Sequence, residues 1–375
     1  MRPPAPLAAI TPPPHGATWP EAMADQAGLN WMFLEEAARF ATENETPWPY
    51  DLRLHLDSGF FEAPPDNEIL GPIRPRGPAN GLVLRNGWKV ASWGETDQVD
   101  FTFSAAKSYL SLLAGIAWTD GLIPDLDEPV RKRVDDGGFD APQNAPITWR
   151  HLLQNTSEWE GTLFGKSDRI DRNRNLGLEG RGKKGDLRPL QPPGTHWEYN
   201  DVRVNRLALA LLRVFRRPLP EVFAERIMRP IGASDAWSWH GYRTSGVEID
   251  GRVIESVSGG THWGGGMLIH AEDQARIGLL MLNRGRWGER QVIPEAWVDL
   301  SFTPCPLNRN YGLLWWLNTG GGRYPSAPED SVMATGAGGN VTWIVPSRGL
   351  VAVLRWTDPG AIDTFTRLIM QALEE

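Results

Sequence analysis

Cysteine is almost absent from this chain: among its 375 residues, only Cys305 is a cysteine. A single cysteine excludes a disulfide within the chain and any zinc site built from several cysteines. The seven histidines are scattered and no His-Glu-x-x-His sequence occurs, so the sequence predicts no metal site. We therefore expect Cys305 to be a small buried residue.

Long apolar runs are missing as well. No stretch of about 18 apolar residues occurs, and prolines interrupt residues 1–6, where a secretory signal needs an unbroken apolar segment. We therefore expect a cytoplasmic protein that does not span a membrane. The formal net charge of -8 argues against a general binder of nucleic acid or of anionic membranes.

Tryptophan, by contrast, is abundant, with 18 residues in the chain, and 41% of all residues are hydrophobic. A chain of this length and composition can bury a sizeable core in one large domain or in two moderate ones. Most of the tryptophans are expected to pack inside this core. A few are expected to wall a pocket for an apolar substrate.

Strand-like segments lie towards both ends of the chain. An Asn86-Gly87 pair separates two strand-like runs within residues 81–93, which is typical of a β-hairpin. A second hairpin is predicted over residues 341–356, and an amphipathic helix over residues 362–373. Further helical segments are predicted at residues 21–45, 104–118, 202–215 and 219–228.

These segments predict an α/β (α+β) fold in which an antiparallel sheet, flanked by helices, is assembled from both chain ends. Residues 1–20 are Pro-rich and predict a loosely attached arm. Residues 21–100 and 255–375 are expected to form the sheet-containing domain, and residues 101–254 a mainly helical subdomain, with the active site at the junction. Within the subdomain, interspersed acids and missing aromatics in Arg169–Arg188 favour a mobile surface loop over a nucleic-acid-binding arm.

The tetrad Ser104-Ala105-Ala106-Lys107 opens a long apolar helix. Side chains three residues apart are neighbours on a helix, so a deprotonated Lys107 could take a proton from Ser104 and make it a nucleophile. The N–H groups of the first turn and the helix dipole favour negative charge at this point. For the tetrad alone, the alternative is a helix-capping serine followed by an exposed lysine.

Two further segments strengthen the catalytic interpretation. Tyr199 follows a Pro-Pro-Gly turn and precedes a predicted helix, where its phenol could enter a cleft. If it faces Lys107, the cation lowers the pKa of the phenol, which can then shuttle protons; a packed tyrosine is the alternative. The small residues of Ala334–Asn340 lead into a strand, and they allow close backbone approach to a ligand and an N–H for an oxyanion hole.

Other candidate residues are less distinctive. His262, beside Trp263, is expected either to line the pocket or to have a purely structural role. Glu158 and Trp159 follow a turn and are expected either to form one rim of the cleft or, again, to be structural. No Gly-x-Ser-x-Gly sequence occurs, which disfavours an α/β-hydrolase fold.

In their order and separations, the three main segments resemble those of the serine β-lactamase and penicillin-binding-protein superfamily. The chain is most similar to the Ser-x-x-Lys/Tyr branch, which includes class C β-lactamases, family VIII carboxylesterases, DD-peptidases and 6-aminohexanoate-dimer hydrolases. The resemblance runs from about Gly81 to the C-terminus and includes Thr156–Trp159 and Gly264–Met267.

This resemblance implies that Ser104 is the acyl-accepting nucleophile, with Lys107 and Tyr199 as the general acid/base pair. It also implies an oxyanion hole made by the backbone N–H groups of Ser104 and Ala337, without a metal or another cofactor. The residues then expected to contact the substrate are Glu158, Trp159, Asp201, His262, Trp263, Thr335 and Gly336.

Two positions depart from the pattern of the superfamily. Ala334 stands where many relatives carry Lys or His, so it offers no cation to a substrate carboxylate unless Arg355 or another side chain substitutes. Asp201 stands where β-lactamases have Asn, and an ionised carboxylate cannot donate a hydrogen bond to a substrate amide. We expect Asp201 to hold Lys107 in position instead.

We therefore predict a serine hydrolase that cleaves a small ester or a linear amide with an apolar acyl part. The alternatives are an amidase or peptidase for D-amino-acid or ω-amino-acid amides, a weak β-lactamase, and a non-catalytic binding or scaffold protein of the same fold. The expected partner is the small-molecule substrate, with neither nucleic acid nor membrane, and the sequence leaves the oligomeric state open.

Overall fold

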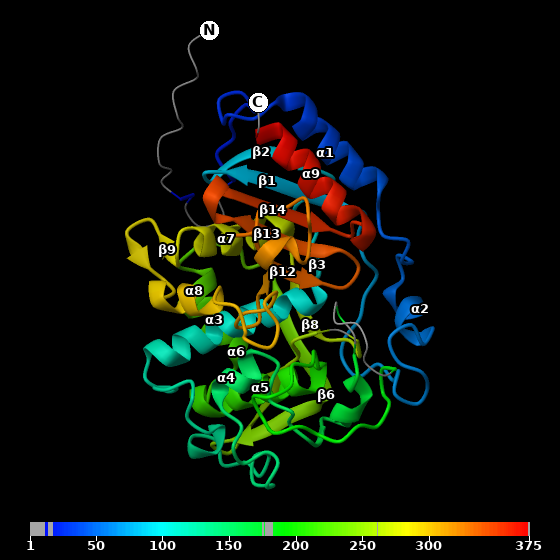
Figure 1. The fold of residues 1–375 in the computed structure, drawn as a ribbon, viewed down its shortest axis with the longest axis vertical. Coiled ribbons are helices and arrows are strands. Elements are labelled where there is room, and N and C mark those ends of the chain that lie inside the picture. Colours follow the sequence, from blue (N-terminus) through cyan, green and yellow to red (C-terminus); the bar gives the residue numbers. More distant parts are fainter. Residues whose placement is uncertain (1–11, 14–17, 175, 177–182, 261, 374–375) are drawn as a thin grey trace.

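The computed structural model of the protein describes all residues except 1–11, 14–17, 175, 177–182, 261 and 374–375 (Figure 1). Its main sheet has six antiparallel strands, and strands from both chain regions pair directly, with Leu82 opposite Val353. In spatial order these strands are β11 (Trp316–Leu317), β12 (Val332–Gly336), β13 (Asn340–Val345), β14 (Leu350–Arg355), β1 (Asn80–Arg85) and β2 (Trp88–Trp93).

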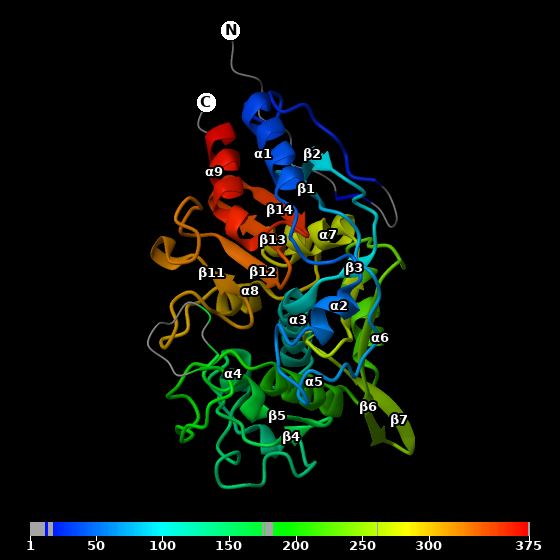
Figure 2. The same ribbon diagram turned by 90° about the vertical axis from the view of Figure 1, so that its right-hand side faces the viewer.

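Helices cover both faces of this sheet. They are α1 (Trp31–Glu43), α9 (Ile362–Leu373) and α7 (Ala271–Leu282). Figure 2 shows α1 and α9 side by side on one face, with α7 on the other. Phe365 of α9 packs against Trp93 of β2, with ring centroids 5.7 Å apart. On the opposite face Gly278 lets α7 approach closely, because a Cβ there would lie 2.6 Å from a methyl group of Val351. The sheet is therefore flanked by helices on both faces, as the sequence predicted.

The helix α3 (Ala106–Thr119) runs through the middle of the molecule, directly after a 3-10 turn over Phe103–Ala105. All residues from Ala106 to Ala117 are buried, which explains why this segment is apolar nearly all round. Gly121 ends the segment with a φ of 72°, a conformation that costs glycine little. Figure 2 shows α3 between the main sheet and the lower half of the protein, and the sheet and the lower half therefore meet at α3.

The lower half combines helices with a second antiparallel sheet of order β3-β8-β6-β7. The remaining helices are α2 (Leu52–Asp57), α4 (Trp149–Leu153), α5 (Asp201–Phe215), α6 (Leu219–Phe223), a π-helical turn (Ala224–Met228) and α8 (Glu295–Ser301). The remaining strands are β3 (Asp100–Phe101), β4 (Thr162–Leu163), β5 (Lys166–Ser167), β6 (Ser238–Ile249), β7 (Arg252–Val257), β8 (Gly266–Ile269), β9 (Arg286–Trp287) and β10 (Arg290–Gln291). Short 3-10 turns cover Val130–Lys132, Asp168–Asp171, Thr319–Gly321, Pro346–Arg348 and Pro359–Ala361.

Several local predictions are confirmed. Asn86 and Gly87 have φ values of 49° and 81° and turn β1 into β2, which is the geometry that favours Asn-Gly in hairpins. The hairpin β13–β14 and helix α9 also lie where the sequence predicts them, and Cys305 is buried. Within the described residues, none of the helices is long and apolar enough to cross a bilayer.

Two local predictions are wrong, and one hairpin was not predicted. The first helix begins at Trp31 rather than near residue 21, because the Asn30 side chain caps it by accepting a hydrogen bond from Met32 N. A long hairpin, β6–β7, lies within the segment predicted to be mainly helical; its Asp250-Gly251 turn is the overlooked indication. The end of the Pro-rich arm is not loose either, since Trp19 is buried against Trp287.

Candidate active site

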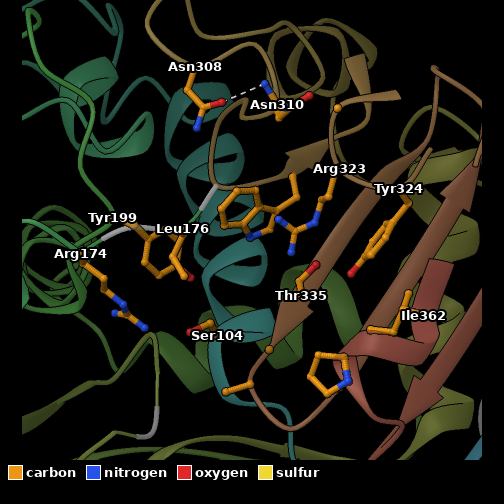
Figure 3. Close-up of a pocket in the computed structure, with 16 residues that line it drawn as sticks. Ser104, Arg174, Leu176, Tyr199, Asn308, Asn310, Arg323, Tyr324, Thr335 and Ile362 are labelled. Carbon is orange, nitrogen blue, oxygen red and sulfur yellow. Dashed lines mark hydrogen bonds between the residues drawn. The ribbon is translucent and has the colours of Figure 1, made fainter. Parts of the chain in front are cut away.

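A cavity of about 440 Å³ opens where the start of α3 meets strand β12 and several loops. Figure 3 shows Ser104, Tyr199 and Arg174 on one side of this cavity and Arg323, Tyr324 and Ile362 on the other. Its lining is mixed, with apolar, aromatic and charged side chains. The lining residues are Ser104, Arg174, Leu176, Tyr199, Asn308, Asn310, Trp316, Gly322, Arg323, Tyr324, Thr335, Gly336, Ala337, Gly339, Pro359 and Ile362.

The structure brings Ser104 and Lys107 into contact. The Lys107 Nζ donates hydrogen bonds to Ser104 Oγ at 2.8 Å and to the Gly259 carbonyl at 3.0 Å, and Lys107 is buried. The preceding Phe103 has a φ of 48°, a left-handed conformation that costs a residue with a side chain about 1 kcal/mol or more. Phe103 is held by edge-to-face packing on Trp48, with centroids 5.4 Å apart. This turn presents Ser104 to the cavity.

Asp201 lies directly behind the Ser104–Lys107 pair. One carboxylate oxygen is 2.7 Å from Lys107 Nζ, and the other is 3.0 Å from Arg174 and 3.1 Å from His262 Nδ1. Burial opposes ionisation of Asp201, but Lys107, Arg174 and His262 outweigh it and hold the pKa of Asp201 well below its usual range. The carboxylate therefore fixes the position of Lys107 and does not line the cavity.

Tyr199 lies between cations and aromatic rings. The ammonium of Lys107 and the guanidinium of Arg174 each lie 5.0 Å from the centre of its ring. The Tyr199 ring also stacks on the Trp316 ring of β11, with ring centroids 5.6 Å apart and an interplanar angle of 25°. Figure 3 shows the Tyr199 side chain beside Ser104 at the cavity wall.

Strand β12 approaches the start of α3 so closely that one position accepts only glycine. A Cβ on Gly336 would lie 1.8 Å from the Thr102 carbonyl oxygen. The approach places the backbone of Ala337 on the cavity wall together with Ser104. Asn340 Nδ2 donates to the Ala337 carbonyl at 2.8 Å and fixes this turn. The small-residue segment thus has the close backbone approach that an oxyanion hole requires.

Arg355 does not take the place of the missing cation at residue 334. Its guanidinium is fully buried and donates to Asn340 Oδ1 at 2.8 Å, so it supports the turn behind the cavity. Its remaining N–H groups donate to the backbone carbonyls of Phe101 and Ile269 and to the side-chain Oε1 of Gln274. Ala334 itself is fully buried in β12, whereas the next residue, Thr335, lines the cavity, as expected from the alternation of side chains along a strand.

A network of ion pairs extends from Asp201 through His262 to Glu62. Lys184 Nζ lies 3.2 Å from Asp171 and 2.6 Å from Glu62, and His262 Nδ1 lies 3.2 Å from Glu62. Glu62, Asp171 and His262 place ligand-type atoms within 4.8 Å of one another, as a metal site would. The Lys184 ammonium contacts both carboxylates, and Arg174 lies 3.4 Å from Asp171, so two cations already balance the two carboxylates and this group does not fit a metal cation well.

Three other candidate residues lie in the protein interior and not at the cavity wall. Glu158 is fully buried and bonded to Arg188 at 2.6 Å and Arg203 at 2.7 Å. The indole N–H of Trp159 donates to the Gly138 carbonyl at 2.7 Å, and that of Trp263 to the Asp66 carbonyl at 2.8 Å. None of the three is among the residues that line the cavity in the described part of the chain.

The buried ion pairs of Glu158 lead to a prediction about stability. Burial alone would raise its pKa, but Arg188 and Arg203 lower the pKa from 4.5 to about 2. A carboxyl whose pKa is lower in the folded state stabilises the fold above about pH 4.5, and this contribution is lost as the pH falls towards 2. Glu158→Gln should therefore lower the free energy of unfolding by about 3 kcal/mol at pH 7.

Urea titrations at pH 7 and pH 3.5 measure this effect, and the difference between variant and wild type should shrink at the lower pH. Glu43→Gln is the matched control, because Glu43 pairs with Arg39 on the exposed surface of α1. That change should cost less than about 0.5 kcal/mol at either pH. Equal losses for the two variants would contradict the assigned role of Glu158.

Two arginines of the site, Arg174 and Arg323, were not predicted from the sequence. Arg174 falls within the segment interpreted as a mobile surface loop, and the surface position is wrong for the N-terminal flank of that segment, since Asp171 and Arg172 are buried. Residues 175 and 177–182 of that segment lie outside the described residues. Arg323 lies in the loop between β11 and β12, and its guanidinium packs 4.0 Å above the Trp316 ring. No spacing rule connects these residues to Ser104, because only the tertiary fold brings them together.

Comparison with known proteins identifies the family. Residues 82–374 match the family described as Beta-lactamase, and because this match covers most of the chain, the protein belongs to that family. The Beta-lactamase fold, a helix-flanked antiparallel sheet, is the architecture described above, and the protein is an enzyme of the hydrolase class. A comparison with curated proteins finds no match.

Solved structures with similar folds carry several activities. A Bacillus anthracis protein provisionally named a 6-aminohexanoate-dimer hydrolase is 16% identical, with 94% of this chain and 86% of that chain covered and a TM-score of 0.57. EstCE1, a hydrolase with promiscuous acyltransferase activity, is 16% identical over 92% and 99% of the two chains, with a TM-score of 0.56. Simvastatin synthase from Aspergillus terreus is 18% identical over 79% and 92%, with a TM-score of 0.54. At these identities the likeness extends to the fold alone.

Proposed function

We propose that the protein is a serine hydrolase that forms an acyl-enzyme on Ser104 and cleaves a small ester or a linear amide. The observation that carries this proposal is the 2.8 Å hydrogen bond from Lys107 Nζ to Ser104 Oγ at the wall of the cavity. A buried lysine that contacts a cavity-facing serine is the arrangement that an activated nucleophile needs.

The contacts of Lys107 indicate different roles for Lys107 and Tyr199, the two members of the acid/base pair. An ammonium has three N–H donors and no acceptor, and those of Lys107 are directed at Ser104, Gly259 and Asp201. We therefore assign the Ser104 proton to the Tyr199 oxygen, with the phenolate stabilised by Lys107 and Arg174. Lys107 orients the nucleophile and supplies positive charge.

The reaction then follows in two acyl transfers. Ser104 Oγ bonds to the substrate carbonyl carbon while its proton passes to Tyr199, and the N–H groups of Ser104 and Ala337 stabilise the oxyanion. The bond to the alcohol or amine breaks, and that group leaves with the proton from Tyr199. Water next attacks the acyl carbon, gives a proton to Tyr199 and releases the acid, and the proton returns to Ser104.

Trapping of the acyl-enzyme tests the proposal directly. Brief exposure to 4-nitrophenyl butyrate at mildly acidic pH should release nitrophenol and add one acyl group to the intact mass, and peptide mapping should locate the group on Ser104. The Ser104→Ala variant should gain no mass. An adduct on another residue, or neither adduct nor nitrophenol release, would overturn the assignment.

A further inference from the structure

One tryptophan contacts the chain next to both backbone N–H groups that are assigned to the oxyanion hole. Trp48, in the loop before α2, packs edge-to-face on Phe103 with ring centroids 5.4 Å apart. The same ring lies against the turn after β12, where a Cβ on Gly338 would be 3.3 Å from Trp48 Cε3. Phe103 immediately precedes Ser104, and Gly338 immediately follows Ala337. A single indole therefore contacts both segments that carry the donors.

The backbone at both contact points has an uncommon conformation. The φ values of Phe103 and Gly338 are 48° and 75°. For a bulky residue such as Phe103, a left-handed conformation persists only where the surrounding packing holds it. The peptide plane that joins Phe103 to Ser104 carries the Ser104 N–H, so a change in the Phe103 backbone would turn this donor away from the oxyanion. The direction of the donor thus depends on how tightly the Phe103 ring is held.

Trp48 is itself fixed at its backbone and at its ring. Its carbonyl accepts two hydrogen bonds from the Arg76 guanidinium, at 2.7 and 3.2 Å. Two residues earlier, Thr46 N donates to the Trp356 carbonyl at 2.7 Å. The indole stacks on His55 with ring centroids 3.8 Å apart. An indole held in this way can restrain the two segments on which it packs.

We propose that Trp48 is a positioning residue, which keeps the two N–H donors of the oxyanion hole aimed at one point by packing on Phe103 and Gly338. This inference rests on the proposed function. Trp48 is not among the residues that line the cavity in the described part of the chain, so it acts through the backbone and does not contact the substrate. It also lies outside residues 82–374, the part of the chain that matches the family. The role is therefore specific to the segment that precedes the main sheet in this chain.

The rate of acylation tests this role. Trp48→Leu keeps an apolar side chain but removes the ring contacts. In a stopped-flow nitrophenol burst with 4-nitrophenyl butyrate, the acylation rate constant should fall about 10- to 100-fold, while the dissociation constant of the ester changes less than about 3-fold. This split is expected because oxyanion donors act in the transition state and not on the bound ester. Trp48→Phe, which keeps an aromatic ring, should recover most of the rate.

Binding of butylboronic acid gives a second measure of the same geometry. Its boron adds Ser104 Oγ and becomes a tetrahedral anion, so its affinity should fall in Trp48→Leu by about the same factor as the acylation rate constant. Trp118→Leu is the matched control. Trp118 is also a partly buried tryptophan, but it lies at the far end of α3 and packs on Trp297, with ring centroids 5.8 Å apart. That variant should lose stability and keep both constants within about 2-fold of wild type.

Hydrogen exchange separates this proposal from the proposed function, because it needs no turnover. In Trp48→Leu, peptides that span residues 100–106 and 334–340 should exchange about 5-fold faster or more, and in Trp118→Leu they should not. Faster exchange in both segments would support the positioning of the two donors even if no ester is hydrolysed. Unchanged exchange, or equal losses of the acylation rate constant in Trp48→Leu and Trp118→Leu, would overturn the proposal even if Ser104 is acylated normally.

Discussion

Ser104→Ala is expected to lower kcat for any hydrolysed ester by on the order of 10⁴-fold or more, because no other group can form the acyl-enzyme. The change removes one oxygen from a partly exposed side chain at the cavity wall, so the free energy of unfolding should change by less than about 1 kcal/mol. Steady-state kinetics and urea denaturation of the same preparation measure the two quantities together.

Ser111→Ala is the matched control for this prediction. Ser111 lies on α3, is fully buried, and its hydroxyl has no hydrogen-bond partner among the described residues, so its loss should be nearly neutral. Wild-type turnover is expected from this variant. Turnover by Ser104→Ala within about 10-fold of wild type would contradict the nucleophile assignment.

The parts of the site that depend on local geometry could be predicted from the sequence. Helical periodicity alone brings Ser104 within reach of Lys107, and their contact is 2.8 Å in the structure. The run of small residues around Gly336 predicts close backbone approach, and the structure has no room for a side chain there. Both predictions needed only rules that act over a few residues.

The electrostatic setting of the site could not be predicted in this way. Arg174 and Arg323 reach the cavity from loops far from Ser104 in the sequence, and each resembles an ordinary surface arginine when only its neighbours in the chain are considered. Arg355 illustrates the opposite case: this basic residue ends the apolar strand β14 and could have reached the substrate, but it is fully buried. Charge at a site depends on which elements meet, and this is a property of the tertiary fold.

The contacts of Asp201 explain why an aspartate in place of asparagine is compatible with the proposed reaction. Its two oxygens contact Lys107 and Arg174, which are the same two cations that lie 5.0 Å from the Tyr199 ring. The carboxylate thus anchors both cations beside the phenol, and it leaves each cation able to interact with charge that develops there. Replacement of one partner in such a buried cluster leaves the others incompletely paired.

This arrangement predicts strong coupling between Lys107 and Tyr199. Lys107→Met keeps the aliphatic stem but removes the ammonium, and Tyr199→Phe keeps the stack on Trp316 but removes the hydroxyl. Each change alone should lower kcat by on the order of 10³-fold, because each disables the same proton transfer. The double variant should be only about as slow as the slower single variant, since the lysine acts through the phenol.

A double-mutant cycle on kcat tests this coupling, and losses that multiply to on the order of 10⁶-fold would indicate separate roles and contradict the assigned pair. Lys166→Met controls for the loss of a buried lysine as such. Lys166 is buried, donates to the Asp66 carbonyl at 2.7 Å and lies 5.2 Å from the Trp263 ring, outside the catalytic cluster. Its replacement should lower stability while kcat stays within a few-fold of wild type, so an effect of charge beside Tyr199 is distinguishable from an effect of a weakened fold.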